Sequence, residues 1–370
     1  MKVAFFIGTL RTEGDGAARV LLTLAREAKR RGVEAVIITG HAEDSSRSPV
    51  PVVLVPSVVW PFYQAYRYPL AGRRTIRRLL DEFQPDVVHV HSPDTMSWAA
   101  AREGRRRGAR VVATHHTDFI RYLAYYHLPG LEPVVWKVLQ RFYSAMDVVT
   151  APSPVTTEEL RAHGLTNVET IPWGVDLEAF GPGFRSEARR RELLGDRSGA
   201  ILLCVCRLTW EKDLKTLAAT HALLKARRDD FAMVVAGEGP AHAEVAALMP
   251  GAVFLGNLEQ GPLSELYASS EVLLFPSSTE TFGSVTLEAM ASGAVPVVAD
   301  AEGSRALVRH GETGLLAPPG DAEAFRERVE TLLDDPALRT RMRAAGLAFA
   351  QDFTWERVFD RLQGAYAPPA

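Results

Sequence analysis

Residues 272–298 read VLLFPSSTETFGSVTLEAMASGAVPVV. The apolar runs at the two ends of this stretch, residues 272–275 and 295–298, are typical of buried parallel strands. Between them the sequence predicts a loop that contains Glu280, followed by a helix that ends at Gly293, because glycine commonly ends helices. A strand, a helix and a second strand in this order predict an α/β fold with a parallel sheet.

The same alternation of short apolar runs and longer segments with helical spacing extends along the chain in both directions. Strands are predicted at residues 3–8, 35–39, 52–55, 87–91, 111–114 and 148–151, and at residues 201–207, 231–236, 253–255, 272–275 and 295–298. Strands that are apolar on both sides and separated by helices form sheets covered on both faces. We therefore expect doubly wound domains, which bind ligands outside the carboxyl ends of their strands.

A chain of 370 residues is too long for a single hydrophobic core, so two domains are expected. The alternation is interrupted at residues 177–183, which are rich in glycine and proline. We place the domain boundary there and predict one domain at residues 1–178 and a second at residues 179–352. Beyond the second domain, Thr354–Tyr366 has the spacing of a further helix.

Composition excludes several classes of protein. The net charge of −3 argues against a nucleic-acid-binding protein. No apolar run approaches the length of a membrane span. The two cysteines, Cys204 and Cys206, lie in an apolar run and predict small buried side chains, because two thiols alone complete neither a zinc site nor a disulfide framework. This cysteine usage suits a reducing cytoplasm.

Charged residues follow the predicted strands of the second half, where ligands are expected. Arg207 and Lys212 suit a pyrophosphate, because two cations can neutralise a departing nucleoside diphosphate without a metal ion. Glu280 and Glu288 can each accept two hydrogen bonds from adjacent hydroxyls, which suits a sugar and a ribose. Free backbone amides at the helix start complete the predicted site and belong to Phe282, Gly283 and Ser284.

Two motifs follow strands in the first half. Gly14 and Gly16 predict a turn whose amides approach an anion, with a simple tight turn as the alternative. His115 and His116 are neighbours on an extended chain and point to opposite sides, so a shared metal ion is not expected. We expect one of the two histidines to face the sugar of the donor, with a buried core histidine as the alternative.

Aromatic and arginine-rich segments in the first half suggest an acceptor surface. Tyr63 and Tyr66 lie in the aromatic stretch at residues 60–69, and Tyr125 lies in a second stretch at residues 122–126. Such segments line acceptor pockets or enter a bilayer interface. Two arginine clusters suit anionic lipid, with solvated helix faces as the alternative: Arg73, Arg74, Arg77 and Arg78, and Arg102, Arg105, Arg106, Arg107 and Arg110.

Taken together, these motifs resemble glycosyltransferase family 4, a large family of retaining enzymes with the GT-B fold. The resemblance covers nearly the whole chain and includes the glycine turn, His115-His116-Thr117, Trp173-Gly-Val-Asp176, Arg207 with Lys212, the Glu280–Glu288 pair and Gly311-Glu-Thr-Gly314. Glu-x7-Glu with Phe282-Gly283 is highly specific, whereas the glycine turn is not. Residues 61–119 and 125–126 look most similar to the group of GDP-mannose-dependent α-mannosyltransferases and sulfoquinovosyl-diacylglycerol synthases.

The resemblance implies two Rossmann-like domains that face a cleft, with the acceptor on the first domain and the donor on the second. It also implies that the C-terminal helix, residues 353–370, packs back on the first domain. In such proteins Glu288 binds the ribose, Glu280 contacts the transferred sugar, and the amides near Gly283 help to hold sugar and phosphate. Arg207 and Lys212 stabilise the diphosphate.

By the same resemblance, His116 contacts the donor sugar, because it precedes the threonine of the recurring His-Thr pair; His115 is the alternative. Gly16 approaches the donor from the first domain. The nucleotide base is expected near Gly237 and Asn257. The predicted catalytic residues are His116, Arg207, Lys212 and Glu280, and the predicted acceptor-side residues are Tyr63, Tyr66, Asp118 and Tyr125.

The sequence therefore predicts a retaining hexosyltransferase that uses GDP-mannose, or alternatively a UDP-hexose with a soluble or polysaccharide acceptor. The expected acceptor is a hydroxyl group, with a membrane lipid or glycolipid as one class, and no cofactor, metal or nucleic acid is expected. The expected location is the cytoplasm, including the inner face of the membrane. A catalytically inactive nucleotide-sugar binder and a sugar-nucleotide epimerase are the competing hypotheses.

Overall fold

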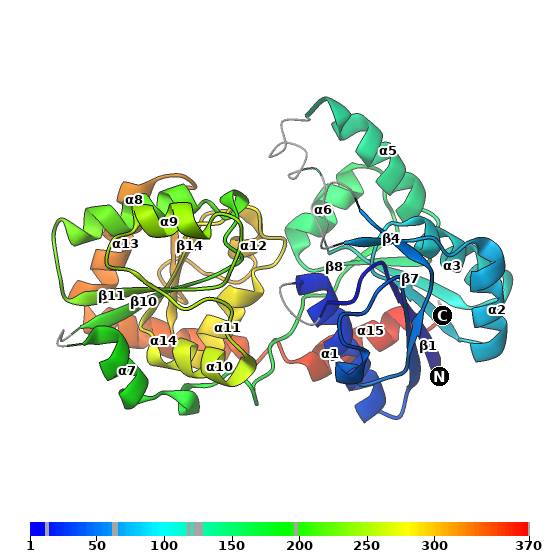
Figure 1. Ribbon diagram of the computed structural model, residues 1–370, viewed down its shortest axis with the longest axis horizontal. Coiled ribbons are helices and arrows are strands. Elements are labelled where there is room, and N and C mark those ends of the chain that lie inside the picture. The colour runs from blue at the N-terminus through cyan, green and yellow to red at the C-terminus, as the bar shows by residue number, and fades with distance from the viewer. Residues whose placement is uncertain (12–14, 61–65, 117–119, 121–128, 196–198, 369–370) are drawn as a thin grey trace. The chain divides into compact units, whose positions relative to one another are not determined.

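The computed structural model describes residues 1–11, 15–60, 66–116, 120, 129–195 and 199–368 (Figure 1). The chain forms two compact units. Unit 1 consists of Met1–Trp173 together with Trp355–Ala370, and unit 2 consists of Gly174–Thr354.

The described part of unit 1 contains a seven-stranded parallel sheet with the order β3-β2-β1-β6-β7-β8-β9. In that order the strands are Val52–Leu54, Glu34–Thr39, Lys2–Ile7, Val87–Val90, Arg110–Thr114, Val148–Ala151 and Val168–Thr170. The direction of winding reverses between β1 and β6, and the carboxyl ends of such a pair of strands form the usual ligand site of a doubly wound sheet.

Helices cover both faces of this sheet because its strands bury alternate residues on opposite sides. Phe6 and Val88 pack in one core with helices α2, α3, α5 and α6. Phe5 and Val87 pack in the other core with helices α1 and α15. The helices are α1 (Gly16–Arg30), α2 (Arg73–Phe83), α3 (Thr95–Arg106), α5 (Glu132–Tyr143), α6 (Pro154–Ala162) and α15 (Trp355–Tyr366), with short turns η1 (Ser45–Arg47) and η2 (Pro129–Leu131).

The C-terminal helix α15 belongs to unit 1, as the sequence predicted (Figure 1). It packs beside α1, and its Phe359, Leu362 and Tyr366 are almost fully buried in the core that α1 also covers. Complete burial of an apolar side chain of this size contributes about 1.5–3 kcal/mol to the stability of the folded state. The helix is therefore an integral part of the fold of unit 1.

Unit 2 contains, in its described residues, a six-stranded parallel sheet with the order β12-β11-β10-β13-β14-β15. The strands in that order are Val253–Phe254, Phe231–Ala236, Ala200–Val205, Val272–Phe275, Val295–Ala299 and Leu315–Ala317. Numbered along the chain this order is 3-2-1-4-5-6, that of dinucleotide-binding folds, and its switch point lies between β10 and β13. The predicted doubly wound architecture is confirmed in both units.

The helices of unit 2 alternate with its strands. They are α7 (Glu187–Leu194), α8 (Leu214–Lys225), α9 (His242–Leu248), α10 (Gln260–Ser269), α11 (Ser284–Ser292), α12 (Glu302–Arg305), α13 (Ala322–Asp334) and α14 (Pro336–Ala350), with short turns η3 (Pro182–Phe184) and η4 (Trp210–Lys212). Gly293 ends α11 with φ of 88°, a left-handed conformation that favours glycine, as expected from the sequence.

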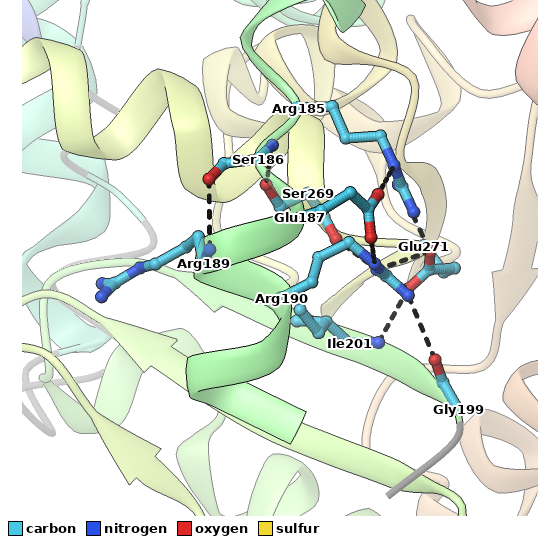
Figure 2. Close-up of polar contacts among 9 residues, drawn as sticks. All are labelled: Arg185, Ser186, Glu187, Arg189, Arg190, Gly199, Ile201, Ser269 and Glu271. Carbon is cyan, nitrogen blue, oxygen red and sulfur yellow. Dashed lines mark hydrogen bonds and ion pairs between the residues drawn. The ribbon is translucent and has the colours of Figure 1, made fainter. Parts of the chain in front are cut away.

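Helix α7 is joined to the amino-terminal edge of this sheet by an ion-pair cluster (Figure 2). Arg190 donates to both carboxylate oxygens of Glu271 at 2.8 Å and to the carbonyls of Ser269 and Gly199. Glu271 also accepts the backbone amide of Ile201 in β10 at 2.8 Å. Because these groups lie at the edge opposite the strands' carboxyl ends, we assign the cluster to stability.

Four arginines of the two predicted clusters in unit 1 surround one carboxylate. The side chain of Glu103, on α3, is only 1% exposed, and four arginines form ion pairs with it: Arg73, Arg77, Arg106 and Arg107. Burial opposes ionisation of Glu103, but hydrogen bonds from the arginines outweigh it and lower the pKa of the carboxyl to about 2. These arginines therefore join α2 to α3.

Replacing Glu103 by glutamine is expected to destabilise unit 1 by about 2 kcal/mol, because charge-assisted hydrogen bonds in a buried position are lost. The folded-state pKa lies below the ordinary 4.5, so the contribution of Glu103 is complete above pH 4.5 and lost as pH falls toward 2. Denaturant unfolding between pH 3 and 7 measures both the loss of stability in the variant and its dependence on pH. Glu82→Gln on α2 is the control, because the Glu82–Arg78 pair is exposed. Equal stability of the two variants at pH 7 contradicts this role.

Candidate functional site

The predicted donor residues of unit 2 lie at the carboxyl ends of four adjacent strands. Asn257 follows β12, Gly237 follows β11, Arg207 follows β10 and Glu280 follows β13. The sheet thus brings together residues that are up to 73 positions apart, from Arg207 to Glu280, at its switch point.

Each of the two predicted cations is paired with a carboxylate. The Lys212 ammonium donates to Oε1 of Glu280 at 2.5 Å, and Ser277 donates to the same oxygen at 3.2 Å. The Arg207 guanidinium donates to Oε1 of Glu211 at 2.9 Å. Both pairs are only partly exposed, so their charges are weakly screened by solvent.

The carboxylate of Glu211 belongs to the candidate site and was not predicted from the sequence. Burial opposes its ionisation, but hydrogen bonds from Thr209 and Arg207 lower the pKa of this carboxyl below its ordinary range. Thr209 donates to it at 2.6 Å. Glu211 lies four residues after Arg207 in the turn that also carries Lys212, and this spacing is the only sequence signal for the pair.

Helix α11 presents its amino terminus and Glu288 at the same end of the sheet. Its N-cap residue is Gly283, with φ of 90°, so no side-chain oxygen caps the first turn. Uncapped amides with the helix dipole favour an anion. Glu288 is 4% exposed, and its Oε2 accepts a hydrogen bond from the Tyr267 hydroxyl at 3.0 Å, which fixes the orientation of the carboxylate. The buried ring of Phe282 anchors the loop, while Ser284 begins the helix.

Gly237 needs to be glycine for structural reasons. Its φ is 134°, and a Cβ there would lie 1.8 Å from the carbonyl oxygen of Cys206. The close packing keeps the backbone after β11 against the segment that leads to Arg207. Asn257, three residues after the end of β12 at Phe254, is exposed at the same edge.

In unit 1 the structure separates the two candidate histidines. His115 is buried, and its Nδ1 lies 3.0 Å from the hydroxyl of Tyr143. His116 lies half-buried at the end of β7, with its ring 5.5 Å from that of Trp173. Burial lowers the pKa of His116 to about 3, with a smaller effect of His115, so the imidazole is neutral at pH 7.

A second histidine at this edge, His91, was not predicted as a site residue. Its Nδ1 lies 2.7 Å from Nε2 of His116. Two residues earlier, His89 hydrogen-bonds Tyr366 and Thr114 on the same face of β6. The sequence signal was available, because histidines at alternate positions of a strand share a face.

The remaining residues predicted in unit 1 differ in their burial and contacts. Tyr66 is partly buried, with its hydroxyl 3.4 Å from Asp94, and burial raises the pKa of its phenol. Gly16 is exposed and begins α1. The backbone amides of the next two residues, Ala17 and Ala18, donate to Oδ1 of Asp15 at 3.0 and 3.2 Å. The other predicted residues lie outside the described residues: Gly14, Tyr63, Asp118 and Tyr125.

The two halves of the sequence match the models of two glycosyltransferase families. Residues 14–179 match Glycosyltransferase Family 4, and residues 185–348 match Glycosyl transferases group 1. A GDP-mannose-dependent alpha-mannosyltransferase of Mycobacterium tuberculosis is 32% identical over 99% of this chain and 96% of its own length. The chain belongs to glycosyltransferase family 4. This family 4 enzyme is also 30% identical to the sulfoquinovosyl transferase SQD2 of Arabidopsis thaliana, over 91% of the chain and 68% of SQD2.

Solved structures confirm the GT-B fold of this family 4 enzyme. Sucrose-phosphate synthase from Thermosynechococcus elongatus superposes with a TM-score of 0.80 at 20% identity, covering 99% of this chain and 98% of the synthase. Anabaena HepE in complex with UDP-glucose gives a TM-score of 0.78 at 20% identity, with 98% of each chain covered. The chain is a glycosyltransferase with two Rossmann-like domains.

Proposed function

We propose that this family 4 enzyme is a retaining hexosyltransferase that transfers mannose from GDP-mannose to a hydroxyl acceptor. The observation that carries the proposal is the set of two cations and two carboxylates at the switch point of unit 2. Lys212 and Arg207 supply positive charge for a diphosphate, while Glu280 and Glu288 accept hydrogen bonds from hydroxyls. The similarity to GDP-mannose-dependent alpha-mannosyltransferases favours this donor.

In the proposed reaction the bond between the anomeric carbon and the diphosphate oxygen breaks first. Arg207, Lys212 and the amides at the start of α11 stabilise the negative charge that develops on the leaving diphosphate. The acceptor hydroxyl then forms the new glycosidic bond on the same face of the sugar, and its proton passes to the leaving phosphate. Glu280 is held by Lys212 and Ser277, which suits a hydroxyl-binding carboxylate more than a covalent nucleophile.

A UDP-hexose is the second candidate donor. A solved structure with the same fold, HepE, holds UDP-glucose. The base of the nucleotide would lie near Gly237 and Asn257, where backbone groups offer little side-chain discrimination between bases.

We propose a membrane lipid as the acceptor class, with the enzyme acting at the inner face of the membrane. Helix α5 of unit 1 and its N-cap residue carry an exposed apolar stripe at helical spacing: Leu131 at the N-cap, and Val134 and Val138 in the helix, are 47%, 59% and 51% exposed. Lys137 and Arg141 on the same helix are also exposed. Apolar residues flanked by cations suit the surface of an anionic bilayer. No helix in the described residues has the length and hydropathy to cross a bilayer.

The proposed donor is tested by thermal unfolding with GDP, UDP and ADP and with their sugars. We expect stabilisation by GDP and GDP-mannose, since a ligand at a hundred times its Kd adds about 2.7 kcal/mol. If UDP alone stabilises the protein, the donor is a UDP-hexose. If none of the nucleotides stabilises it, the proposed donor site in unit 2 is wrong.

The transfer step is tested separately with the stabilising donor and lipid vesicles. Release of free diphosphate only when acceptor is present indicates a transferase; release or isomerisation without acceptor indicates another activity. The anomeric configuration of the product, measured by NMR, distinguishes retention from inversion.

A further inference from the structure

The position of Glu280 depends on a contact outside the predicted motifs. In the sheet of unit 2, β13 lies between β10 and β14, so the loop that carries Glu280 lies between the segments that follow these two neighbours. On the β10 side, Lys212 donates to the Glu280 carboxylate at 2.5 Å, and Thr279 donates to the backbone carbonyl of Glu211 at 3.2 Å. On the β14 side the neighbour is Gly303, in the short helix α12.

Gly303 packs directly on the backbone of Glu280. It is buried, and a Cβ placed on it would lie 2.2 Å from the carbonyl oxygen of Glu280, 2.7 Å from the carbonyl carbon and 3.1 Å from the Cβ. Real Cβ atoms do not approach other atoms within 3.0 Å, so a side chain at position 303 requires one of the two segments to move. The φ of Gly303 lies outside the left-handed region, so the close packing, and not the backbone conformation, requires glycine here.

Of the two segments, the loop that carries Glu280 is the one we expect to move. The chain around Gly303 is closed into a helical turn by a backbone hydrogen bond from Arg305 to Ala301 at 2.9 Å. The Glu280 carboxylate, in contrast, is held by the side chain of Lys212, and both partners of this pair are only partly buried. A displaced Glu280 backbone would therefore change the distance between the carboxylate and the ammonium.

We propose that Gly303 is a positioning residue for glycosyl transfer. Because it has no side chain, the Glu280 backbone packs against it, and the Glu280 carboxylate is held where both Lys212 and a hydroxyl of the donor sugar can reach it. The inference rests on the proposed function for the role of Glu280 in transfer. The packing of Gly303 on Glu280 is a property of unit 2 without any substrate.

The test replaces Gly303 by alanine, the smallest change that adds a Cβ. We expect kcat for transfer to fall about 10²-fold, the effect of misplacing a group at the reacting centre by about 1 Å. GDP, which lacks the sugar, should stabilise the variant against heat as much as the wild type. If Gly303 had only a structural role in α12, alanine would raise stability and leave kcat unchanged, because alanine favours helices more than glycine does.

The matched control is Gly261→Ala, in α10 of the same unit, where an added Cβ meets no atom of other described segments within 4 Å. We expect its kcat to stay within about twofold of wild type. The double variant Gly303→Ala with Glu280→Gln tests whether Gly303 acts through Glu280. We expect its kcat to equal that of Glu280→Gln alone, because effects that pass through one group are not additive.

Equal kcat for Gly303→Ala and Gly261→Ala, or a double variant in which the two losses multiply, overturns the proposal. If Gly303→Ala does not fold, Glu280→Asp provides the test, since it moves the carboxylate by one methylene with Gly303 intact. A similar loss of kcat then supports the proposal, and full activity overturns it. If the wild type transfers no sugar, the proposed function fails, while crystal structures of wild type and Gly303→Ala still show whether Glu280 moves.

Discussion

Replacing Lys212 by methionine is expected to lower kcat about 10²–10³-fold, the usual cost of removing one group that stabilises transition-state charge. The substitution removes the ammonium and leaves its partner, the carboxylate of Glu280, without the 2.5 Å ion pair. The site then repels the charge that develops on the diphosphate instead of neutralising it. Steady-state release of diphosphate in the presence of acceptor measures the effect.

The matched control is Lys215→Met, which removes the same charge three residues later. Lys215 is exposed at the start of α8, with its ammonium 5.7 Å from the centre of the Trp210 ring. We expect its kcat to remain within about twofold of wild type, as is usual for a surface position. If both variants lose the same activity, general electrostatics and not the Lys212–Glu280 pair is responsible.

Replacing Glu280 by glutamine is expected to leave only a trace of turnover, about 10²–10³-fold below wild type, while nucleotide binding is preserved. Glutamine keeps the shape but cannot form the ion pair with Lys212, and its NH₂ donates where the carboxylate accepts. The free nucleoside diphosphate, which lacks the sugar, should stabilise the variant against heat as much as the wild type. Parallel measurements of transfer and of thermal stabilisation test the two halves of this expectation.

Glu312→Gln is the control for Glu280, because Glu312 is exposed and pairs with Arg309 on the surface. Full activity in Glu280→Gln would show that Glu280 is not a catalytic residue. Loss of nucleotide binding together with activity would assign it to the diphosphate region instead of the sugar.

The architecture was largely predictable from the sequence because parallel strands buried on both faces are continuous apolar runs. The strands at residues 231–236 and 272–275 have the predicted bounds. Four short strands were not predicted: β4 (Ser57–Val59), β5 (Arg67–Pro69), β9 and β15. Each has three residues, too few to show a period, and β9 and β15 lie at sheet edges where only one neighbour stabilises them.

The position of the predicted donor residues at the carboxyl ends of adjacent strands was predictable, because the segments that follow parallel strands meet at one edge of a doubly wound sheet. Their partners were not predicted, although their spacing gave weak signals. Glu211 follows Arg207 by four residues, and His91 follows His89 by two, but only the structure shows that Glu211 pairs with Arg207 and that His91 contacts His116. The arginines around Glu103 have a structural role that was not predicted, since the sequence does not show that a buried carboxylate lies among them.

The ends of unit 2 lie next to each other. The amide of Val175 donates to the carbonyl of Phe353 at 2.7 Å, close to the points where the chain enters and leaves the unit. In topology, unit 2 is therefore an insertion into the chain of unit 1, and the parallel bridge between Val175 and Thr354 joins its two ends. Such an insert can be exchanged as a whole by two recombination events, at positions that are far apart in the sequence but close in the structure, which would join a different unit 2 to an unchanged unit 1.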